Sequence, residues 1–304
     1  MKSKDFYEKG MPVILEALHC KEEEVTYVAA LKKGMTNRSH LFLVRGKKYI
    51  LRIPGEGTDQ LIDRKNEVDV FQAISGRGLC DDPVYVNAEN GCKITAFLEG
   101  VRSCDPDDVQ DLKRCMEKLR AFHHMNLKVS HTFDVFGQIE FYEALWGGKP
   151  SAYPDYEETK KAIFDKRKIV DKLPKEWCLA HIDAVCDNFL FYKGEDGREE
   201  LQLTDWEYAG MQDPHLDLAM FALYSNYDKS QTDRLIDLYF KGDPGWQIRS
   251  KIYYYVAACG LLWSNWTEYK ETLGVEFGDY GPRQYAYAKE FMTYLSDKAF
   301  LESA

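Results

Sequence analysis

The sequence predicts an α+β protein in two parts, a small N-terminal part (residues 1–98) built on an antiparallel sheet and a larger, mainly helical part (residues 99–304). Two observations support this division. The first third of the chain contains short apolar or alternating runs separated by tight turns, which is the pattern of antiparallel strands. Most of the remainder shows apolar residues at helical spacing. With 304 residues, the chain is long enough for one large or two modest domains with hydrophobic cores.

The predicted sheet begins with three adjacent strands. Residues 26–45 have the pattern of a strand, a turn and a return strand, and a third strand covers residues 48–53. Tight turns between successive strands produce an antiparallel meander. Two further strands are predicted at residues 83–86 and 93–98, on either side of a turn at residues 90–91.

One charged residue interrupts the apolar third strand. Arg52 alternates with Leu51 and Ile53, so its side chain faces away from theirs. A helix is predicted over residues 59–75, and Glu67 on that helix is the candidate partner of Arg52. A strand cation tied to a helix carboxylate is the arrangement that kinases use to contact nucleotide phosphates. The alternative interpretation is a surface arginine and a surface glutamate that do not meet.

The helical part contains clear helix starts. Asp followed by Pro favours the first turn of a helix, and this pair occurs at Asp105 and at Asp213. Asp217 falls in the first turn of the second of these helices, where it could cap the backbone of the loop at residues 181–188 or complement the helix dipole. The longest helical pattern covers residues 248–272.

A polar motif precedes a predicted hairpin. His181, Asp183 and Asn188 follow the spacing H-x-D-x-x-x-x-N, and Asp205 comes seventeen residues after the Asn. Residues 189–204 form two short apolar or alternating runs around a Gly-containing turn, which is typical of a β-hairpin. This hairpin would bring Asn188 and Asp205 to the same end, where a metal ion could lie between them.

The motif matches the needs of kinase-type phosphoryl transfer. In that reaction, one Asp orients the substrate hydroxyl and accepts its proton, while an Asn and a second Asp hold the Mg²⁺ that bridges the nucleotide phosphates. The spacing therefore predicts Asp183 as the base and Asn188 and Asp205 as metal ligands. The alternative is a chance grouping of polar loop residues around a hairpin.

Two tryptophans lie three residues apart in the longest predicted helix. Trp263 and Trp266 therefore share one face of that helix. They are interpreted either as part of an aromatic core or as walls of a cage that binds a quaternary ammonium group by cation–π attraction.

The composition limits the possible partners and compartments. A net charge of -10 argues against nucleic acid or an anionic membrane as the main partner, and it is compatible with a cationic substrate. No run of about 18 apolar residues is present, so no membrane insertion is expected. The eight cysteines form no C-x-x-C pair, so no zinc site is indicated. The polar N-terminal residues do not resemble a signal peptide. Together these features predict a cytoplasmic protein with reduced thiols.

Over roughly residues 31–295, the chain resembles the choline/ethanolamine kinase branch of the aminoglycoside phosphotransferase-like kinases, and within it the bacterial choline kinases of the LicA type. The fold implied by this resemblance is the two-lobed protein-kinase-like fold, with residues 1–98 as the nucleotide-binding lobe. The motifs that carry the resemblance are Gly34–Asn37, Tyr49–Gly55, His181–Asn188, Asp205–Gly210, Asp217–Ala219 and the W-x-x-W of Trp263 and Trp266.

The resemblance implies ATP as the phosphate donor. Arg52 stands where other kinases have Lys, and together with Glu67 it would contact the nucleotide phosphates. The turn that precedes the second strand would add backbone N–H groups, and its implied residues are Gly34, Thr36 and Asn37. This turn contains a single Gly, which is fewer than in many nucleotide-binding turns.

The resemblance also implies roles in the catalytic loop and behind the hairpin. Asp183 would be the base, and Asn188 and Asp205 would hold Mg²⁺, with Glu207 contributing through a second ion. Many relatives have Gly at the position of Ile182, between the His and the Asp. This departure is found in bacterial choline kinases and separates the chain from the antibiotic kinases.

The implied acceptor is choline or a similar cationic alcohol. Four aromatic residues are expected to bind it, namely Trp263, Trp266, Tyr285 and Tyr227. Two alternatives remain open: the same chemistry on ethanolamine, an aminoglycoside or another small alcohol, and a non-catalytic choline-binding pseudokinase. The sequence does not decide the oligomeric state.

Overall fold

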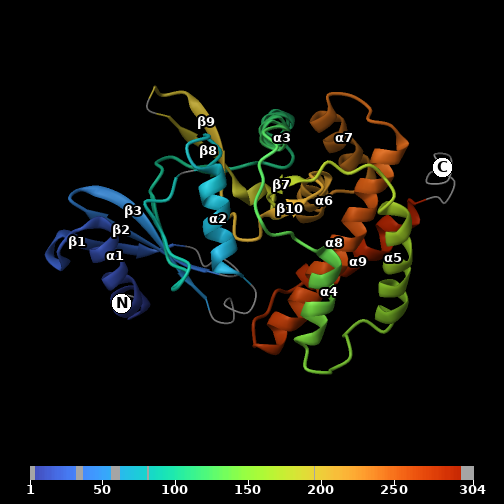
Figure 1. The fold of residues 1–304 in the computed structure, drawn as a ribbon, viewed down its shortest axis with the longest axis horizontal. Coiled ribbons are helices and arrows are strands. Elements are labelled where there is room, and N and C mark those ends of the chain that lie inside the picture. The colour runs from blue at the N-terminus through green and yellow to red at the C-terminus, as the bar shows by residue number, and fades with distance from the viewer. Residues whose placement is uncertain (1–3, 32–36, 56–61, 81, 195, 296–304) are drawn as a thin grey trace. The chain divides into compact units, whose positions relative to one another are not determined.

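The structure, a computed structural model, describes residues 4–31, 37–55, 62–80, 82–194 and 196–295. The chain forms two compact units, and Figure 1 labels most of their elements. The sheet unit consists of Met1–Ser103 and Phe189–Ala209, and the helical unit consists of Cys104–Asn188 and Gly210–Ala304. The predicted domain boundary at residue 98 stays a prediction. The sheet unit differs from the predicted N-terminal part because it also contains the hairpin of residues 189–209.

The sheet unit is built on a five-stranded antiparallel sheet with the order β1-β2-β3-β5-β4. Its strands are β1 (Val25–Ala30), β2 (Asn37–Val44), β3 (Lys47–Pro54), β4 (Tyr85–Val86) and β5 (Lys93–Ala96). The predicted meander is therefore confirmed. Its register places Arg52 opposite Ser39 on one side and Lys93 on the other.

Two helices belong to this unit, α1 (Met11–Leu18) and α2 (Arg64–Ile74). The first follows a short π-helical turn, Phe6–Gly10, and was not predicted. Its buried residue Ile14 and the preceding Phe6 join the core formed by the sheet, which includes Phe42 and Leu51. The second helix begins later than predicted, because the side chain of Asp63 accepts hydrogen bonds from the backbone of the first turn.

A three-stranded sheet with the order β6-β8-β9 completes the sheet unit. Its strands are β6 (Arg102–Ser103), β8 (Phe189–Lys193) and β9 (Glu199–Leu203). Strands β8 and β9 are the predicted hairpin, and Phe189 pairs with Leu203. Asn188 precedes β8 and Asp205 follows β9 along the chain, and their meeting around a metal ion stays a prediction.

The helical unit contains the rest of the secondary structure. Its elements are α3 (Val109–His124), α4 (Val135–Ala144), α5 (Tyr156–Val170), β7 (Cys178–Ala180), β10 (Gly210–Gln212), α6 (His215–Tyr224), α7 (Lys229–Phe240), α8 (Trp246–Thr272) and α9 (Tyr280–Thr293). Helix α8 is buried over most of its length and packs against α4, α5, α6 and α9. No helix in the described part of the chain is long and apolar enough to cross a membrane.

One predicted helix start was wrong. The helix expected from Asp105 begins at Val109, because Asp108 caps it by accepting hydrogen bonds from Gln110 N and Asp111 N. The side chain of Asp105 instead accepts from Asp107 N in a preceding turn. The Asp-Pro pair therefore belongs to the turn that immediately precedes the N-cap of the helix.

Helices α8 and α9 approach closely at a glycine. A Cβ atom at Gly260 would lie 2.6 Å from Gln284 O and 2.8 Å from Ala288 N, both of which are backbone atoms of α9. The absence of a side chain at Gly260 therefore sets the distance between the two helices.

Replacing Gly260 with Ala is expected to lower the free energy of unfolding by about 1–3 kcal/mol, because the backbone of α9 must move away. Helix propensity alone has the opposite sign, since Ala is favoured over Gly by about 1 kcal/mol. Urea unfolding measures the difference. The matched control is Gly137→Ala in α4, whose Cβ would press on the side chain of Asp134, the N-cap of that helix, rather than on the backbone of another helix, and which is expected to cost less than Gly260→Ala. A stabilised Gly260→Ala protein would contradict the assignment.

Candidate active site

The loop after β7 carries the predicted base. Asn188 donates from Nδ2 to the backbone oxygen of Asp183 at 2.8 Å and to its carboxylate Oδ2 at 3.0 Å. The Asp183 side chain is half-buried. Because the amide nitrogen of Asn188 is used in this way, its Oδ1 is left as the acceptor atom of that side chain. The structure therefore brings Asp183 and Asn188 together, and each orients the other.

A buried carboxylate fixes the start of the same loop. Asp217, at the first turn of α6, accepts from His181 N at 2.9 Å and from Ile182 N at 2.7 Å. Ile182 has φ +69°, which is rare for a β-branched residue and marks a strained backbone. The two hydrogen bonds hold that conformation immediately before Asp183. The predicted capping role of Asp217 is confirmed.

His123, which the sequence places at the C-terminal end of a helix, completes this network. Its Nε2 lies 2.9 Å from Asp217 Oδ2 and its Nδ1 lies 2.8 Å from the hydroxyl of Tyr239. Both side chains and Asp217 are buried. The contact of His123 with Asp217 was not predicted, because the partners of His123 come from α6 and α7, far along the chain.

In the sheet unit, four buried side chains of alternating charge form a closed ring, hereafter the charge ring. Arg52 on β3 bonds to Glu67 Oε1 through Nη2 and lies 3.5 Å from Glu207 Oε2 through Nη1. Arg64, at the start of α2, uses Nη1 to contact Glu67 Oε2 at 3.0 Å and Glu207 Oε2 at 3.3 Å. The predicted Arg52–Glu67 pair is confirmed. Arg64 was not predicted, because nothing along the chain relates it to Glu207.

Two further predicted residues border the charge ring. Asn37, the first residue of β2, donates from Nδ2 to Glu207 Oε2 at 2.8 Å. Asp205 Oδ1 lies 3.6 Å from Arg52 Nη1, and the Asp205 side chain is 37% exposed. Asp205 itself has φ +63°, so a second predicted functional residue coincides with an unusual backbone conformation.

The carboxylates of the charge ring respond differently to burial. Burial favours the neutral form of Glu67, but the charge of Arg52 outweighs it and lowers the pKa of Glu67. Burial and the nearby carboxylate of Asp205 raise the pKa of Glu207, although Arg52 acts in the opposite direction. The net effect favours the neutral form of Glu207, and the charge of Arg52 is the main opposing influence.

In the helical unit, five aromatic rings follow one another and are called the aromatic row. Centroid distances are 5.9 Å from Trp263 to Trp266, 5.1 Å from Trp266 to Phe277, 6.5 Å from Phe277 to Tyr280 and 6.5 Å from Tyr280 to Tyr224. The row thus joins the C-terminal half of α8 to the start of α9 and the end of α6.

One end of the aromatic row lies beside the catalytic loop. The hydroxyl of Tyr224 donates to Asp187 Oδ2 at 2.9 Å. Burial, followed by the charge of Asp183, raises the pKa of Tyr280, so these two side chains are electrostatic neighbours. Tyr280 and Phe277 were missed from the sequence, because their spacing from the tryptophans is not helical.

The remaining predicted residues have other partners. Tyr285 stacks on Tyr153 with centroids 3.9 Å apart, and its hydroxyl bonds to Asp155 Oδ1 and Thr159 Oγ1. The hydroxyl of Tyr227 donates to the backbone oxygen of Pro106. The places of Tyr285 and Tyr227 in a substrate pocket stay predictions. The predictions for Gly34 and Thr36 lie outside the described residues.

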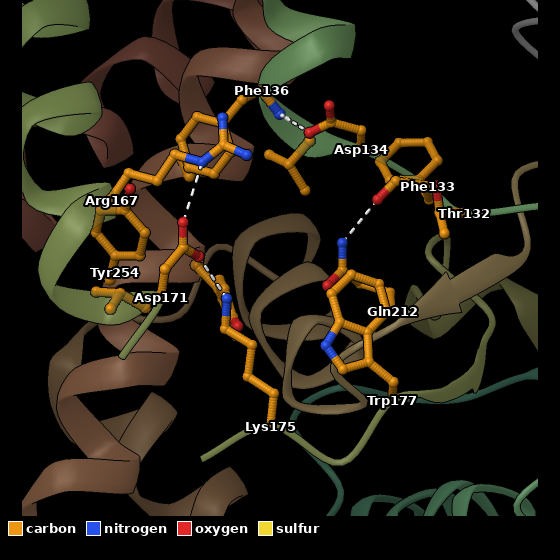
Figure 2. Close-up of a pocket in the computed structure, with 14 residues that line it drawn as sticks. Thr132, Phe133, Asp134, Phe136, Arg167, Asp171, Lys175, Trp177, Gln212 and Tyr254 are labelled. Carbon is orange, nitrogen blue, oxygen red and sulfur yellow. Dashed lines mark hydrogen bonds and ion pairs between the residues drawn. The ribbon is translucent and has the colours of Figure 1, made fainter. Parts of the chain in front are cut away.

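A separate cavity of about 190 Å³ lies in the helical unit, and Figure 2 shows it. Phe136, Tyr254 and Trp177 contribute aromatic walls, and Arg167 and Asp171 form an ion pair at its edge. Its lining includes none of the predicted catalytic or substrate residues. Within the described ranges of the chain, no group of three or more His, Cys, Asp or Glu side chains is arranged to hold a metal ion.

Comparison with known proteins decides the family. The model of a family described as choline/ethanolamine kinase matches residues 28–236. The chain belongs to the choline/ethanolamine kinase family. It is therefore a kinase-like phosphotransferase that acts on an alcohol group of a small molecule.

Individual relatives agree with this family. The protein LicA of Haemophilus influenzae is 29% identical over 259 residues, which cover 81% of this chain and 94% of the relative. The crystal structure of choline kinase LicA from Streptococcus pneumoniae matches with a TM-score of 0.80 and 28% identity, covering 95% of this chain and 99% of that chain. Aminoglycoside 2'-phosphotransferase-IIIa matches with a TM-score of 0.63 and 15% identity, covering 96% and 99% of the two chains, and shows the fold alone. The predicted α+β, kinase-like fold is confirmed.

Replacing Asp217 with Asn tests the network behind the catalytic loop. The amide keeps the shape of the side chain but offers one oxygen instead of two, so one buried donor loses its acceptor. The expected loss is about 1–3 kcal/mol of unfolding free energy, with a fall in kcat of at least about tenfold because Asp183 is no longer held. Urea unfolding and steady-state kinetics measure both.

The control is Asp134→Ala, which removes the N-cap of α4 in the same unit. It is expected to cost about 1 kcal/mol without a change in kcat. An Asp217→Asn protein with unchanged kcat would show that the loop does not need this carboxylate.

Proposed function

We propose that the protein transfers phosphate from ATP to choline, with Asp183 as the base and Mg²⁺ as the cofactor. The observation that carries this proposal is the aromatic row, which runs from Trp263 to Tyr280, the electrostatic neighbour of Asp183. An acceptor held along this row would have its cationic end on aromatic faces and its hydroxyl near a carboxylate. The likeness to choline kinase LicA of Streptococcus pneumoniae supports the same acceptor.

The chemistry of the row favours a quaternary ammonium group. Aromatic faces attract cations without needing hydrogen bonds, whereas a primary ammonium group has three N–H donors that need acceptors. Within the chain, the primary ammonium of Lys270 lies 5.7 Å from the centroid of the Trp266 ring, which shows that this ring can accept a cation. Ethanolamine is the second candidate, since several ethanolamine kinases are relatives, including human ethanolamine kinase 1 at 22% identity over 53% of this chain and 38% of that protein.

In the proposed reaction, the hydroxyl oxygen of choline attacks the γ-phosphorus of ATP in line with the departing β-phosphate oxygen. Asp183 orients the hydroxyl and accepts its proton as the new O–P bond forms. Asn188 holds the carboxylate of Asp183 in place through its amide nitrogen. Arg52, fixed by Glu67, donates to the phosphates and balances their charge.

The donor set fits a hard divalent cation. Mg²⁺ prefers carboxylate and amide oxygens, and the proposed ligands are Asn188 Oδ1, the partly exposed carboxylate of Asp205 and Glu207. Glu207 Oε2 already accepts from Asn37, Arg64 and Arg52, so any share of Glu207 in metal binding would come through its other oxygen. When bound, Mg²⁺ neutralises negative charge on the nucleotide phosphates. The turn residues Gly34, Thr36 and Asn37 are proposed to line the nucleotide site.

Replacing Asp183 with Asn tests the base and the acceptor together. ADP release from Mg-ATP is measured with choline, ethanolamine, a kanamycin-type aminoglycoside and no acceptor. Release with choline is expected for the wild-type protein, and a fall in kcat of about 10²–10⁴-fold is expected for Asp183→Asn, since general base catalysis contributes this much.

The matched control is Asp196→Asn, the same change at an exposed carboxylate in the β8–β9 turn, which is expected to keep full activity. Release only with another acceptor would keep the chemistry and overturn the choice of choline. No release with any of the acceptors would favour the pseudokinase alternative.

Replacing Trp263 with Leu tests the aromatic row. Loss of the π-face removes a cation–π contact of about 0.5–2 kcal/mol, so the KM for choline is expected to rise about 3- to 30-fold while the KM for ATP stays within twofold. The control is Trp246→Leu, an exposed tryptophan at the other end of α8. Thermal unfolding confirms that both proteins are folded. An unchanged KM for choline in Trp263→Leu would remove Trp263 from the site.

A further inference from the structure

The charge ring contains a second arginine, Arg64, in addition to the pair formed by the strand residue Arg52 and the helix residue Glu67. Arg52 and Glu67 already form a pair, yet Arg64 touches the second oxygen of Glu67 and also reaches Glu207. Each arginine of the ring thus contacts both glutamates. Three of the four corners, Arg52, Glu67 and Arg64, come from β3 and α2, while Glu207 follows β9.

Burial makes this arrangement demanding. The side chains of Arg52, Arg64, Glu67 and Glu207 have exposed fractions of 7%, 8%, 1% and 2%. In such surroundings a charge without a partner is strongly unfavourable. If Arg64 were neutral, the guanidinium of Arg52 would be shared among Glu67, Glu207 and Asp205, with Lys93 as a further cation near Glu67.

The surroundings of Arg64 are also shaped for its side chain. Gly91 has φ +65°, and a Cβ atom there would lie 2.8 Å from Arg64 Nε and 2.7 Å from Pro54 Cγ. The glycine at this turn therefore leaves room for the guanidinium. Arg64 Nε and Nη2 have no hydrogen-bond partner within the part of the chain that the structure describes, so the contacts that orient the group are those of Nη1.

We infer that Arg64 is a positioning residue for the phosphate-binding arginine, acting through the two carboxylates that Arg64 and Arg52 share. The inference rests on the proposed function for the role of Arg52. Arg64 holds one oxygen of Glu67, so that the other oxygen faces Arg52. Arg64 also donates to Glu207, so Arg52 is not the only guanidinium that pairs with this carboxylate. The guanidinium of Arg52 therefore stays available to bind a phosphate.

The experiment measures Mg-ATP binding by titration calorimetry without any acceptor, so that its outcome does not depend on the identity of the alcohol. Arg64→Met, which keeps the length of the side chain and removes its charge, is expected to weaken Mg-ATP binding about tenfold or more. Arg64→Lys, which keeps the charge but loses the planar donor fork, is expected to weaken it about threefold or less. The KM for the acceptor is expected to stay within twofold in both proteins.

The matched control is Arg77→Met, the same change at an exposed arginine just beyond the other end of α2. It is expected to bind Mg-ATP like the wild-type protein. A purely structural role for Arg64 predicts a lower unfolding temperature with no separation between nucleotide and acceptor affinity. The inference is overturned if Arg64→Met is folded and binds Mg-ATP within twofold of wild type, or if both affinities fall together.

A second pair of variants displaces Arg64 without changing its charge, and it decides the question if Arg64→Met does not fold. Gly91→Ala places a methyl group against Arg64, whereas Gly76→Ala has a similar positive φ of +68° with nothing within 4 Å of its Cβ. Both positions have a similar positive φ, so the difference between them reports the contacts of the new methyl group with the Arg64 side chain and with Pro54 Cγ. Mg-ATP binding is expected to be about 3- to 10-fold weaker in Gly91→Ala than in Gly76→Ala, and equal affinities would overturn the inference. A wild-type protein that does not bind Mg-ATP would instead overturn the proposed function.

Discussion

The carboxylate of Asp217 is fully buried, and the conformation of the loop at residues 181–188 depends on the hydrogen-bond donors that surround this carboxylate. A buried carboxylate is tolerated only with donors around it, and here two backbone N–H groups and the ring of His123 supply them. The same bonds hold Ile182 at a positive φ, which aims the next residue, Asp183. One interaction therefore joins the start of α6, the end of β7 and the end of α3, and it determines where Asp183 lies.

The sheet unit solves a similar problem with paired charges. Glu67 and Glu207 are each placed between Arg52 and Arg64, so no member of the charge ring is buried without opposite charge on both sides. Such a ring contributes little net stability by itself, because desolvation offsets most of the attraction. Its effect is on geometry, since each side chain can adopt few positions without leaving a neighbour unpaired. A fixed orientation of the Arg52 guanidinium suits the proposed contact with phosphates, where the direction of the N–H donors matters more than the strength of the ion pairs.

The aromatic row gives the helical unit a different chemistry. Its five rings come from α6, α8, α9 and the segment between α8 and α9, and they are packed edge to face or tilted. Such walls discriminate by charge and shape, because every ring presents a π-face and few hydrogen-bond partners. An acceptor site along this row is the proposal that membership of the choline/ethanolamine kinase family supports.

The sequence by itself determined the class of fold, the antiparallel meander and the hairpin of residues 189–204. It offered the pairing of Arg52 with Glu67 and the capping role of Asp217 beside alternatives, and the structure decided in favour of both. These features depend on local periodicity and on motifs of fixed spacing, which a single sequence displays. Only the tertiary structure decided that Arg64 closes the charge ring, that His123 supports Asp217, that Tyr280 and Phe277 continue the row of tryptophans, and that Tyr285 stacks on Tyr153. These contacts join residues far apart in the chain, and their geometry is set by how the helices and strands pack, which no local pattern records.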